Sequence, residues 1–366
     1  TQAAPFGFHP ACAALQNLFN QKKLAVIANV GNLVRPVTRA GLLAGTDARP
    51  VQLFSHSDQL RQIQSADATD LLQTGWGGRM ADRLPGLNAG NLFPALTSLG
   101  DSRTFIQGQS SIPLSLPPFD FFSIFGTDDV QFTGLRNAAM LQMLNESSAN
   151  YYEQAAQTLA NKSLQSTDVV NPIFSNQNTP VTQLFKGASS DIAQQLRQVA
   201  RLIESRAATG LKRQIFFVRQ SQYDTHVSQL ADQNHLLSDL SAALQTFTDA
   251  MALLGLERNV TTFTISDFGR TFKPATGGGT DHGYGNYAFV MGGAVKGGDF
   301  YGQVPTPVMG GPDDIGDDGR WIPTTSMEQY GATLAGWLGL DAASLAYAFP
   351  NLQSFARTDL GFMHPA

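Results

Sequence analysis

The sequence predicts an α/β fold in which helices cover a mostly parallel sheet. Two runs rich in β-branched and aromatic residues, QIFFVRQ at 214–220 and VTTFTIS at 260–266, indicate buried strands. Between them, residues 228–255 carry apolar side chains at helical spacing and end in Gly255. A strand, a long helix and a second strand in succession form a βαβ unit, which implies parallel strands covered by helices.

The other elements follow from the same patterns, in chain order. A helical pattern over 10–21 precedes LAVIANVG at 24–31, a buried strand, and TFIQG at 104–108 is a weaker strand candidate. AFVMGGAV at 288–295 completes the strands. Further helices are predicted at 56–72, 136–163, 188–209 and 326–340.

We expect residues 1–366 to form a single domain, because neither an internal repeat nor a linker is visible. Within it, the Pro- and Phe-rich segment near 109–130 predicts an irregular surface excursion over a pocket, followed by a helical insertion near 130–210. The acidic cluster at 311–319 misses the EF-hand spacing, so a solvated loop is favoured over a calcium site.

Composition excludes several classes of protein. The formal net charge of −5, without a basic stripe, argues against a nucleic-acid partner. Charged residues make up only 14%, which suits a secreted, periplasmic or cell-surface location. No apolar run is long enough to span a membrane. The single cysteine, Cys12, excludes an internal disulfide framework, and its Ala- and Leu-rich surroundings predict an inert, buried thiol.

The segment FVRQSQYDTH places Asp224 and His226 just after a predicted strand, where α/β proteins form their sites. Two residues apart in an extended loop, both side chains can reach one ion. A carboxylate with an imidazole suits zinc, manganese or a similar divalent metal. The alternative is that Asp224 only caps the helix that follows.

Two further segments carry candidate ligands. TISDFGRT ends a strand at Asp267, and Arg270 could hold an anionic substrate or form only a structural ion pair with that carboxylate. GGGTDHGYG places Asp281 and His282 between glycines, where the backbone can approach an ion closely. The alternative for this segment is a flexible connector.

The segment LFSHSDQL places Ser55 before a predicted helix. Its hydroxyl could act as a nucleophile near backbone N–H groups that favour an anion. The alternative is an N-cap with Asp58 completing a variant of the capping box. The role of His56 stays open between these two interpretations.

In chain order these groups are a hydroxyl, Asp and His, Asp, and His, which resembles the alkaline phosphatase superfamily. The chain is identified as a member of a bacterial branch, the domain of unknown function 1501 family. The resembling segments run from end to end of the chain and include FGFHPACAALQ, FSHSDQ, TGWGGRMAD, YDTHVSQ, TISDFGRTF, GTDHGYGNYAFVMGG and RWIPTTSMEQYGATLAGWLGL.

The resemblance implies a three-layer α-β-α sandwich, alkaline phosphatase-like, with its site at one end of the sheet. Ser55 corresponds to the nucleophile, with Arg270 as a catalytic residue. Asp224, His226 and His282 resemble ligands of one metal. The second metal would be bound by Asp267 and bridged by Ser55.

His56 and Asp281 are expected around the ligands or the substrate, where Asp281 could orient the imidazole of His282. Zinc is the preferred ion, with manganese, magnesium or calcium as alternatives. The chain departs from the phosphatase pattern at Phe268, where the phosphatases carry a histidine ligand. It also has no counterpart to a Gly- and Asn-Asp-rich first-strand segment that family members carry upstream.

The leading hypothesis is a secreted or periplasmic metal-dependent hydrolase of phosphate or sulfate esters, acting on a small-molecule or glycan ester. The alternative is a non-catalytic secreted or cell-surface protein on a degenerate phosphatase scaffold, which would bind a glycan or a protein partner. A Ser-His-Asp esterase is disfavoured, because the chain has no GxSxG elbow.

Overall fold

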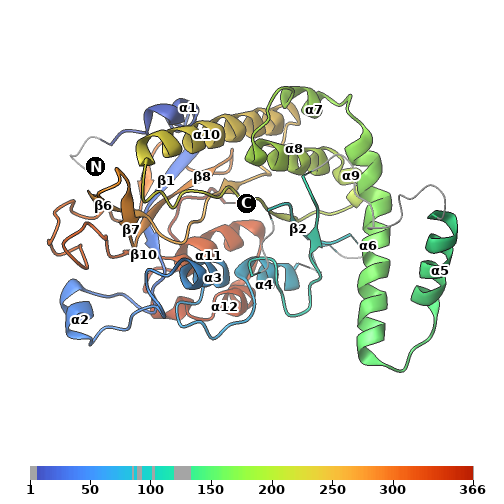
Figure 1. The fold of residues 1–366 in the computed structure, drawn as a ribbon, viewed down its shortest axis with the longest axis horizontal. Coiled ribbons are helices and arrows are strands. Elements are labelled where there is room, and N and C mark those ends of the chain that lie inside the picture. The colour runs from blue at the N-terminus through green and yellow to red at the C-terminus, as the bar shows by residue number, and fades with distance from the viewer. Residues whose placement is uncertain (1–5, 85, 89–92, 101–103, 119–132, 366) are drawn as a thin grey trace.

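The computed structural model describes residues 6–84, 86–88, 93–100, 104–118 and 133–365 (Figure 1). The described strands are β1 (Leu24–Gly31), β2 (Leu96–Ser98), β3 (Leu114–Ser115), β4 (Ile215–Phe217), β5 (Thr262–Phe263), β6 (Arg270–Pro274), β7 (Thr280–His282), β8 (Asn286–Met291), β9 (Phe300–Tyr301) and β10 (Thr325–Ser326). The described α-helices are α1 (Ala13–Asn20), α2 (Arg39–Ala44), α3 (His56–Ser65), α4 (Trp76–Asp82), α5 (Thr133–Asn145), α6 (Tyr151–Ser175), α7 (Pro180–Leu184), α8 (Asp191–Glu204), α9 (Arg206–Thr209), α10 (Gln229–Leu253), α11 (Met327–Leu338) and α12 (Ala342–Ala348). Short 3₁₀ helices cover Pro10–Cys12 and Leu352–Ser354.

The strands form two main sheets and a small hairpin. The first sheet has the order β10-β1-β8-β5, with β9 also paired to β1, and the second has the order β3-β2-β4. β8 is antiparallel to both β1 and β5, so the expectation of a mostly parallel sheet was wrong and the first sheet is mixed. The physical reason is the connection: only the β6–β7 hairpin lies between β5 and β8, without the crossover helix that parallel neighbours need.

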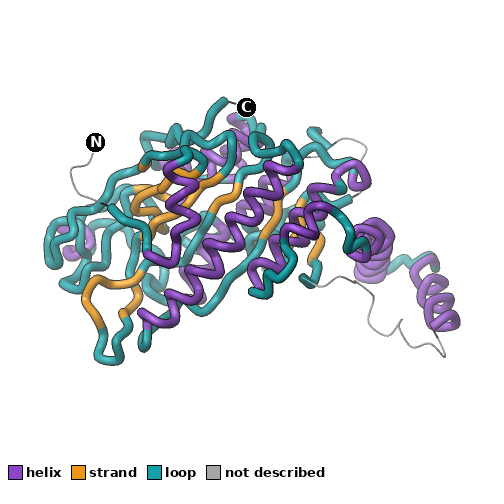
Figure 2. Tube along the Cα trace, turned by 90° about the horizontal axis from the view of Figure 1, so that it is seen from above, coloured by secondary structure: helices purple, strands orange, loops and turns teal. Residues whose placement is uncertain are grey.

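Helices cover both faces of the sheets, as Figures 1 and 2 show. In β1, Ala25 and Ile27 enter a hydrophobic core shared with α3, α4, α11 and α12. The alternate side chains Leu24 and Val26 enter a second core with α1, α7, α8 and α10. Every residue of β1 is buried, because successive side chains of a strand point to opposite faces and both faces are covered.

One predicted strand is confirmed and several other predicted elements differ from the structure. The strand predicted at 24–31 is β1, with the same first and last residues. Residues 104–108 form a turn, in which Phe105 is buried against the ring of Trp76 instead of pairing in a sheet. The expected helix at 136–163 is divided between α5 and α6, which project from the body as a pair. Of the expected excursion near 109–130, β3 pairs with β2, and residues 119–130 lie outside the described residues.

The expected βαβ unit has its elements but not its pairing. β4, α10 and β5 follow in order, yet β4 pairs with β2 and β5 pairs with β8, in different sheets.

The acidic segment at 311–319 is an ordered turn, in which the buried carboxylate of Asp314 accepts hydrogen bonds from the N–H groups of Gly310, Gly316 and Gly319. Cys12 is buried, as expected, and burial raises the pKa of its thiol. Among the described helices, not one combines the length and the apolar character that crossing a membrane requires.

One buried carboxyl group affects stability. Glu328, in the first turn of α11, is only 1% exposed. Its Oε1 accepts a hydrogen bond of 3.1 Å from Asn351 Nδ2, whereas Oε2 has no hydrogen-bond partner. Burial raises the pKa of Glu328 from an ordinary 4.5 to about 7, although the hydrogen bond from Asn351 acts in the opposite direction.

We expect Glu328→Gln to stabilise the protein at pH 8 and to lose that advantage at pH 5. Between pH 4.5 and 7 the unfolded chain releases this proton while the folded chain retains it, so stability falls as the pH rises. The raised pKa corresponds to at most about 3 kcal/mol at pH 8. Urea unfolding at both pH values measures the difference, with Glu146→Gln, an exposed site, as the control. Equal effects of Glu328→Gln at the two pH values would contradict this account.

Candidate metal centre

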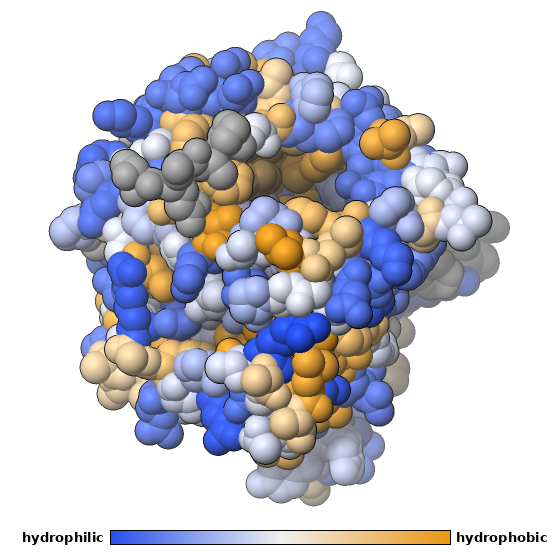
Figure 3. Space-filling view, turned by 90° about the vertical axis from the view of Figure 1, so that its left-hand side faces the viewer, coloured by the Kyte–Doolittle hydropathy of each residue, from blue (hydrophilic) through white to orange (hydrophobic). Residues whose placement is uncertain are grey.

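Four segments from distant parts of the chain meet beside the ends of β4 and β5. They are the start of α3 at His56, the loop after β4 with Asp224, the loop after β5 with Asp267, and the β6–β7 hairpin, which ends at His282. Figure 3 views the molecule from the side on which β6, β7 and α2 lie in Figure 1. This face is hollowed, and hydrophobic residues show in the depth of the hollow.

One carboxylate oxygen, Asp224 Oδ1, lies at the centre of the cluster. Histidine Nε2 atoms approach it at 2.9 Å from His226, 3.1 Å from His56 and 3.3 Å from His282. Nη1 of Arg270 adds a fourth nitrogen at 2.5 Å. A carboxylate offers about four acceptor positions over its two oxygens, so four nitrogens crowd this one oxygen. Residues His56, Asp224 and His282 together form a group that could hold a metal ion.

The partners of the other ring nitrogens set the tautomers of His56 and His282. Nδ1 of His282 lies 2.7 Å from the carbonyl oxygen of Phe54, which can only accept, so this nitrogen carries the proton. Nδ1 of His56 lies 2.7 Å from Asp267 Oδ2, and Nδ1 of His226 lies 3.2 Å from Asp281 Oδ1. Assigned from the two hydrogen bonds, neutral His56 and His282 have their free lone pair on Nε2, facing Asp224.

The Nε2 atoms of the three histidines differ in their hydrogen-bond partners. Those of His226 and His282 lie 3.1 Å apart in a hydrogen bond, in which His226 donates because the proton of neutral His282 is on Nδ1. Nε2 of His56 is buried without a hydrogen-bond partner, because its 3.1 Å approach to Asp224 does not have hydrogen-bond geometry. Buried polar atoms of this kind call for a ligand.

The charges in the cluster favour an ionised Asp224. Burial raises the pKa of this carboxyl group, but the nearby nitrogens of His56 and Arg270 outweigh burial and lower the pKa to about 2. For His56, burial lowers the pKa, and the nearby carboxylates of Asp267 and Asp224 raise it, with a net increase. The site therefore places a negatively charged oxygen beside basic nitrogens. A metal cation would take the place of the protons that these nitrogens share with the oxygen.

Phe268 and Asp267 hold the imidazole rings in place. The ring of Phe268 is buried, and its centroid lies 4.5 Å from that of His56 and 4.8 Å from that of His282. Asp267 uses both oxygens, since Oδ2 faces His56 and Oδ1 accepts from the Phe268 N–H at 3.0 Å and from Ser266 Oγ at 3.1 Å. The phenylalanine that departs from the phosphatase pattern thus packs against two candidate ligands.

The glycine-rich segment before His282 lies directly against the loop that carries His226. A Cβ atom on Gly279 would approach the backbone carbon of His226 to 2.1 Å, so only glycine fits there. Gly278 has a φ of +74°, in the left-handed region that glycine adopts without strain. Gly279 therefore allows β7 to lie against the 224–226 loop, and Gly278 allows the turn that precedes it.

Ser55 lies next to the cluster in sequence, but its hydroxyl points elsewhere. Ser55 Oγ donates to Asp58 Oδ2 at 2.5 Å and lies 3.2 Å from Ser57 Oγ, and it makes no capping hydrogen bond to α3. Neither expected role, the cap or the metal-bridging hydroxyl, appears in its contacts with the described residues. Asp58, considered earlier only as part of a cap, is the acceptor of the hydroxyl proton.

The residues of this cluster are all among the candidates that the sequence offers, with His56 expected only at its periphery. The structure brings Asp224, His226 and His282 together and places Nε2 of His56 3.1 Å from Asp224 Oδ1, between the distances of the other two histidines. Sequence reasoning missed His56 because a histidine at the first position of a helix has no distinctive spacing. Its one available signal was its position beside Ser55, at a predicted helix start.

Comparisons with known proteins identify a family. The chain matches the family model described as "Protein of unknown function (DUF1501)" over residues 1–354. No curated protein and no solved structure gives a significant match. A relation to alkaline phosphatases or sulfatases therefore has no support from these comparisons, and it rests on the order of the site residues alone. Because the match covers nearly all of its length, this chain belongs to the DUF1501 family.

Proposed function

We propose that this protein is a metal-dependent hydrolase of phosphate or sulfate esters, with its ion at the Asp224 cluster. The observation that carries the proposal is the approach of the Nε2 atoms of His56 and His282 to one ionised carboxylate oxygen, in a group that could hold a metal ion. Hydrogen-bond acceptors behind these two rings fix their tautomers. Metal-binding histidines typically donate their second ring nitrogen to such acceptors, which sets the tautomer and the ring orientation.

Zinc fits the donor set best among the divalent ions. Two imidazole nitrogens and one carboxylate oxygen are typical ligands of a catalytic zinc ion, whereas magnesium and calcium prefer oxygens. Donors about 2.0–2.1 Å from a tetrahedral zinc ion lie about 3.3 Å apart. Asp224 Oδ1 lies 3.1 Å from Nε2 of His56 and 3.3 Å from Nε2 of His282.

The geometry favours His56 as a metal ligand and Asp267 as an orienting residue, which reverses the roles expected from the sequence. We assign His56 as a ligand, because its Nε2 faces the centre, and Asp267 as the group that orients His56, because both Asp267 oxygens are already hydrogen-bonded. Only one metal position then has a full set of donors among the described residues.

The hydrolytic step would use residues around the ion. A bound zinc ion supplies Lewis acidity and stabilises negative charge on the group being transferred. Ser55 is the candidate nucleophile, since its hydroxyl donates a hydrogen bond to Asp58 and keeps the oxygen lone pairs available for attack. Arg270, which already pairs with Asp224, is the cation best placed to bind an oxygen of the ester. These roles are the ones that an alkaline phosphatase-like architecture would require.

A second candidate function is a non-catalytic binding protein on the same scaffold. The observation that favours it is Ser55, whose hydroxyl turns toward Asp58 and makes no hydrogen bond to the Asp224 cluster. Under either function we propose an extracytoplasmic location, because only 14% of residues are charged. A small-molecule or glycan ester is the proposed ligand of the hydrolase, and a glycan or cell-surface protein that of the binding protein.

We expect the purified protein to bind one zinc ion per chain, with a large loss of affinity in Asp224→Ala and His282→Ala. Removing one donor leaves the zinc ion with an incomplete coordination shell, so we expect the zinc affinity to fall about 100-fold or more. Isothermal titration calorimetry against zinc measures the affinity. The matched control is His235→Ala, an exposed histidine on α10 that should change nothing. Equal affinities in all four proteins, or no zinc binding, would refute the metal centre.

We expect zinc-dependent hydrolysis of p-nitrophenyl phosphate or p-nitrophenyl sulfate, with kcat reduced about 1000-fold or more in Ser55→Ala because the nucleophile is removed. Ser57→Ala is the control, since this neighbouring hydroxyl contacts the same Asp58 carboxylate. Release of p-nitrophenol with zinc, manganese, magnesium or calcium measures turnover. A protein that binds zinc but hydrolyses neither ester with any of these ions would favour the binding protein.

A further inference from the structure

Helices α5 and α6 form a hairpin that projects from the body, at the end of the molecule opposite the β6–β7 hairpin (Figure 1). The two helices run antiparallel, because only residues 146–150 connect them. Nε2 of Gln157 joins them by donating to the carbonyl oxygens of Met143 and Glu146, at 3.1 and 2.8 Å. Residues 134–165 are all described, and not one of them is buried. The apolar side chains of this hairpin are therefore open to solvent.

The base of the hairpin is fixed to the body. Val170 and Phe174, near the C-terminal end of α6, lie in the hydrophobic core with α8 and α10. Nη2 of the buried Arg201 donates to the carbonyl oxygens of Ile173 and Phe174, at 2.7 and 2.6 Å. These contacts set the direction of α6, so its first half and α5 extend from the body as an arm of fixed orientation.

α5 carries apolar side chains on two of its sides. Met140 and Leu144 are half-buried and face α6, which packs against α5. Leu135, Ala139 and Met143 follow one another at intervals of four residues and form a second stripe, which is exposed. Leu135 is 75% exposed and Met143 is 68% exposed. Because an apolar stripe marks a side that a helix buries, the second stripe of α5 calls for a partner.

α6 repeats this arrangement. Gln157, which bonds to α5, marks the side of α6 that faces α5. Tyr152, Ala156 and Leu159 form an exposed stripe on another side, with Tyr152 88% exposed. In both helices the exposed stripe lies about 120–130° around the helix from the side that faces the other helix, in the same rotational sense. Since the helices are antiparallel, the two exposed stripes lie on one face of the hairpin, which we call the hairpin face.

The hairpin is an electrically neutral part of an acidic chain. Residues 133–165 contain Arg136, Lys162, Glu146 and Glu153, two positive and two negative charges, so their formal sum is zero. The whole chain has a formal net charge of −5, which the remaining residues therefore carry. Two copies of this chain consequently repel each other least where their hairpins meet. A nucleic acid or an anionic membrane would instead require a basic surface.

We propose that the hairpin face is the interface of a homodimer, in which two hairpins pack about a two-fold axis as a four-helix bundle. A two-fold contact uses the same surface on both copies, so the exposed stripes of one copy meet those of the other. Each helix then has one neighbour from its own chain and one from the second copy, which matches its two sides.

The size of the hairpin face sets the expected strength of the dimer. α5 and the exposed part of α6, residues 151–165, are each about 20 Å long, and two adjacent helices are about 20 Å wide. Pairing at this face covers roughly 600 Å² on each copy, at the lower end of the range for specific interfaces. We therefore expect a dissociation constant of about 1–10 μM. The dimer does not rest on the proposed hydrolase, because the hairpin and the metal cluster lie at opposite ends of the molecule.

Sedimentation equilibrium of the whole chain, from about 1 to 500 μM, tests the dimer. Met143→Glu and Leu159→Glu each place a charge in the interface, and Gln165→Glu places the same charge on the other side of α6 as the matched control. All three side chains are exposed in a single copy, so the substitutions leave the fold intact. We expect each face variant to weaken dimerisation about 100-fold or more, because it buries an unpaired charge, and the control to stay within about 3-fold.

A chain that stays monomeric at all these concentrations, or a dimer that neither face variant weakens, would overturn the proposal. Binding of such a monomer to phosphatidylcholine vesicles, lost in Leu159→Glu, would make a membrane the occupant of the hairpin face instead.

Thiol reactivity locates the interface independently. Because Cys12 is buried and is the single cysteine, Ala156→Cys and Gln165→Cys each introduce the one accessible thiol of their chain. We expect the rate constant of the maleimide reaction to fall about 10-fold for Ala156→Cys as the concentration rises through the dimer range, and to stay constant for Gln165→Cys. Equal behaviour of the two thiols would contradict an interface at this face. Both readouts are separate from zinc binding and ester hydrolysis.

Discussion

The site depends on one electrostatic constraint, the approach of imidazole nitrogens to a single ionised oxygen of Asp224. The rings of His282 and His56 are fixed from behind, by the Phe54 carbonyl and by the Asp267 carboxylate. Their Nε2 atoms therefore face the centre of the cluster. Lone pairs that face an ionised oxygen repel it, and the arrangement becomes favourable once a cation lies between them, which is the physical basis of the proposed metal centre.

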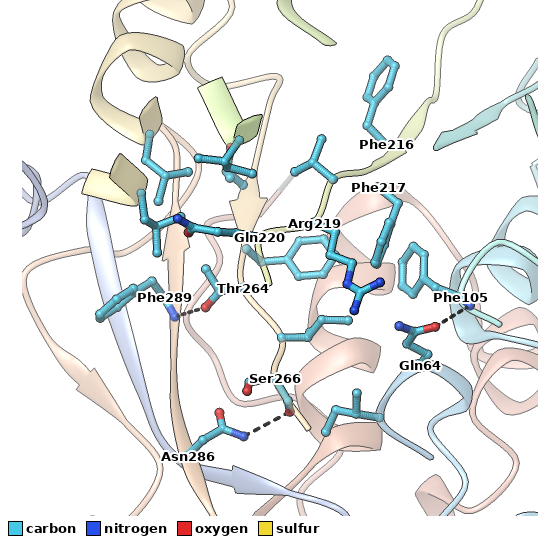
Figure 4. A pocket seen from close by; sticks show the side chains of 18 of the residues that line it. Gln64, Phe105, Phe216, Phe217, Arg219, Gln220, Thr264, Ser266, Asn286 and Phe289 are labelled. Carbon is cyan, nitrogen blue, oxygen red and sulfur yellow. Dashed lines mark hydrogen bonds between the residues drawn. The ribbon is translucent and has the colours of Figure 1, made fainter. Parts of the chain in front are cut away.

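The rest of the fold serves to hold these four groups in place. Two apolar cores, one on each face of β1 and β8, position the strands whose ends carry the site loops. The glycines before His282 allow its strand to lie directly on the backbone of the 224–226 loop. The stacked ring of Phe268 then restricts the rotation of two imidazoles. The same helices line the cavity between β4 and β5 (Figure 4), to whose wall His56 and Asp224 also contribute.

The sequence predicts individual elements better than their partners. Its patterns gave β1 without error because an apolar run ending in glycine is a local signal, and they selected Asp224, His226 and His282 because these follow strands and glycines. They did not predict the antiparallel β8 or the separation of β4 from β5, since pairing depends on chain connections rather than on strand composition. The central position of His56 was also missed, because a contact with Asp267, 211 positions away, establishes it.

Zinc-edge anomalous diffraction from crystals grown with zinc tests the central claim most directly. Our account predicts one strong anomalous peak in the cluster, about 2.0–2.1 Å from the Nε2 atoms of His56 and His282 and from an oxygen of Asp224. Nδ1 of His282 should remain bonded to the Phe54 carbonyl. The account would be contradicted by crystals with saturating zinc in which the peak is missing and Arg270 still occupies Asp224, or in which the ion binds elsewhere.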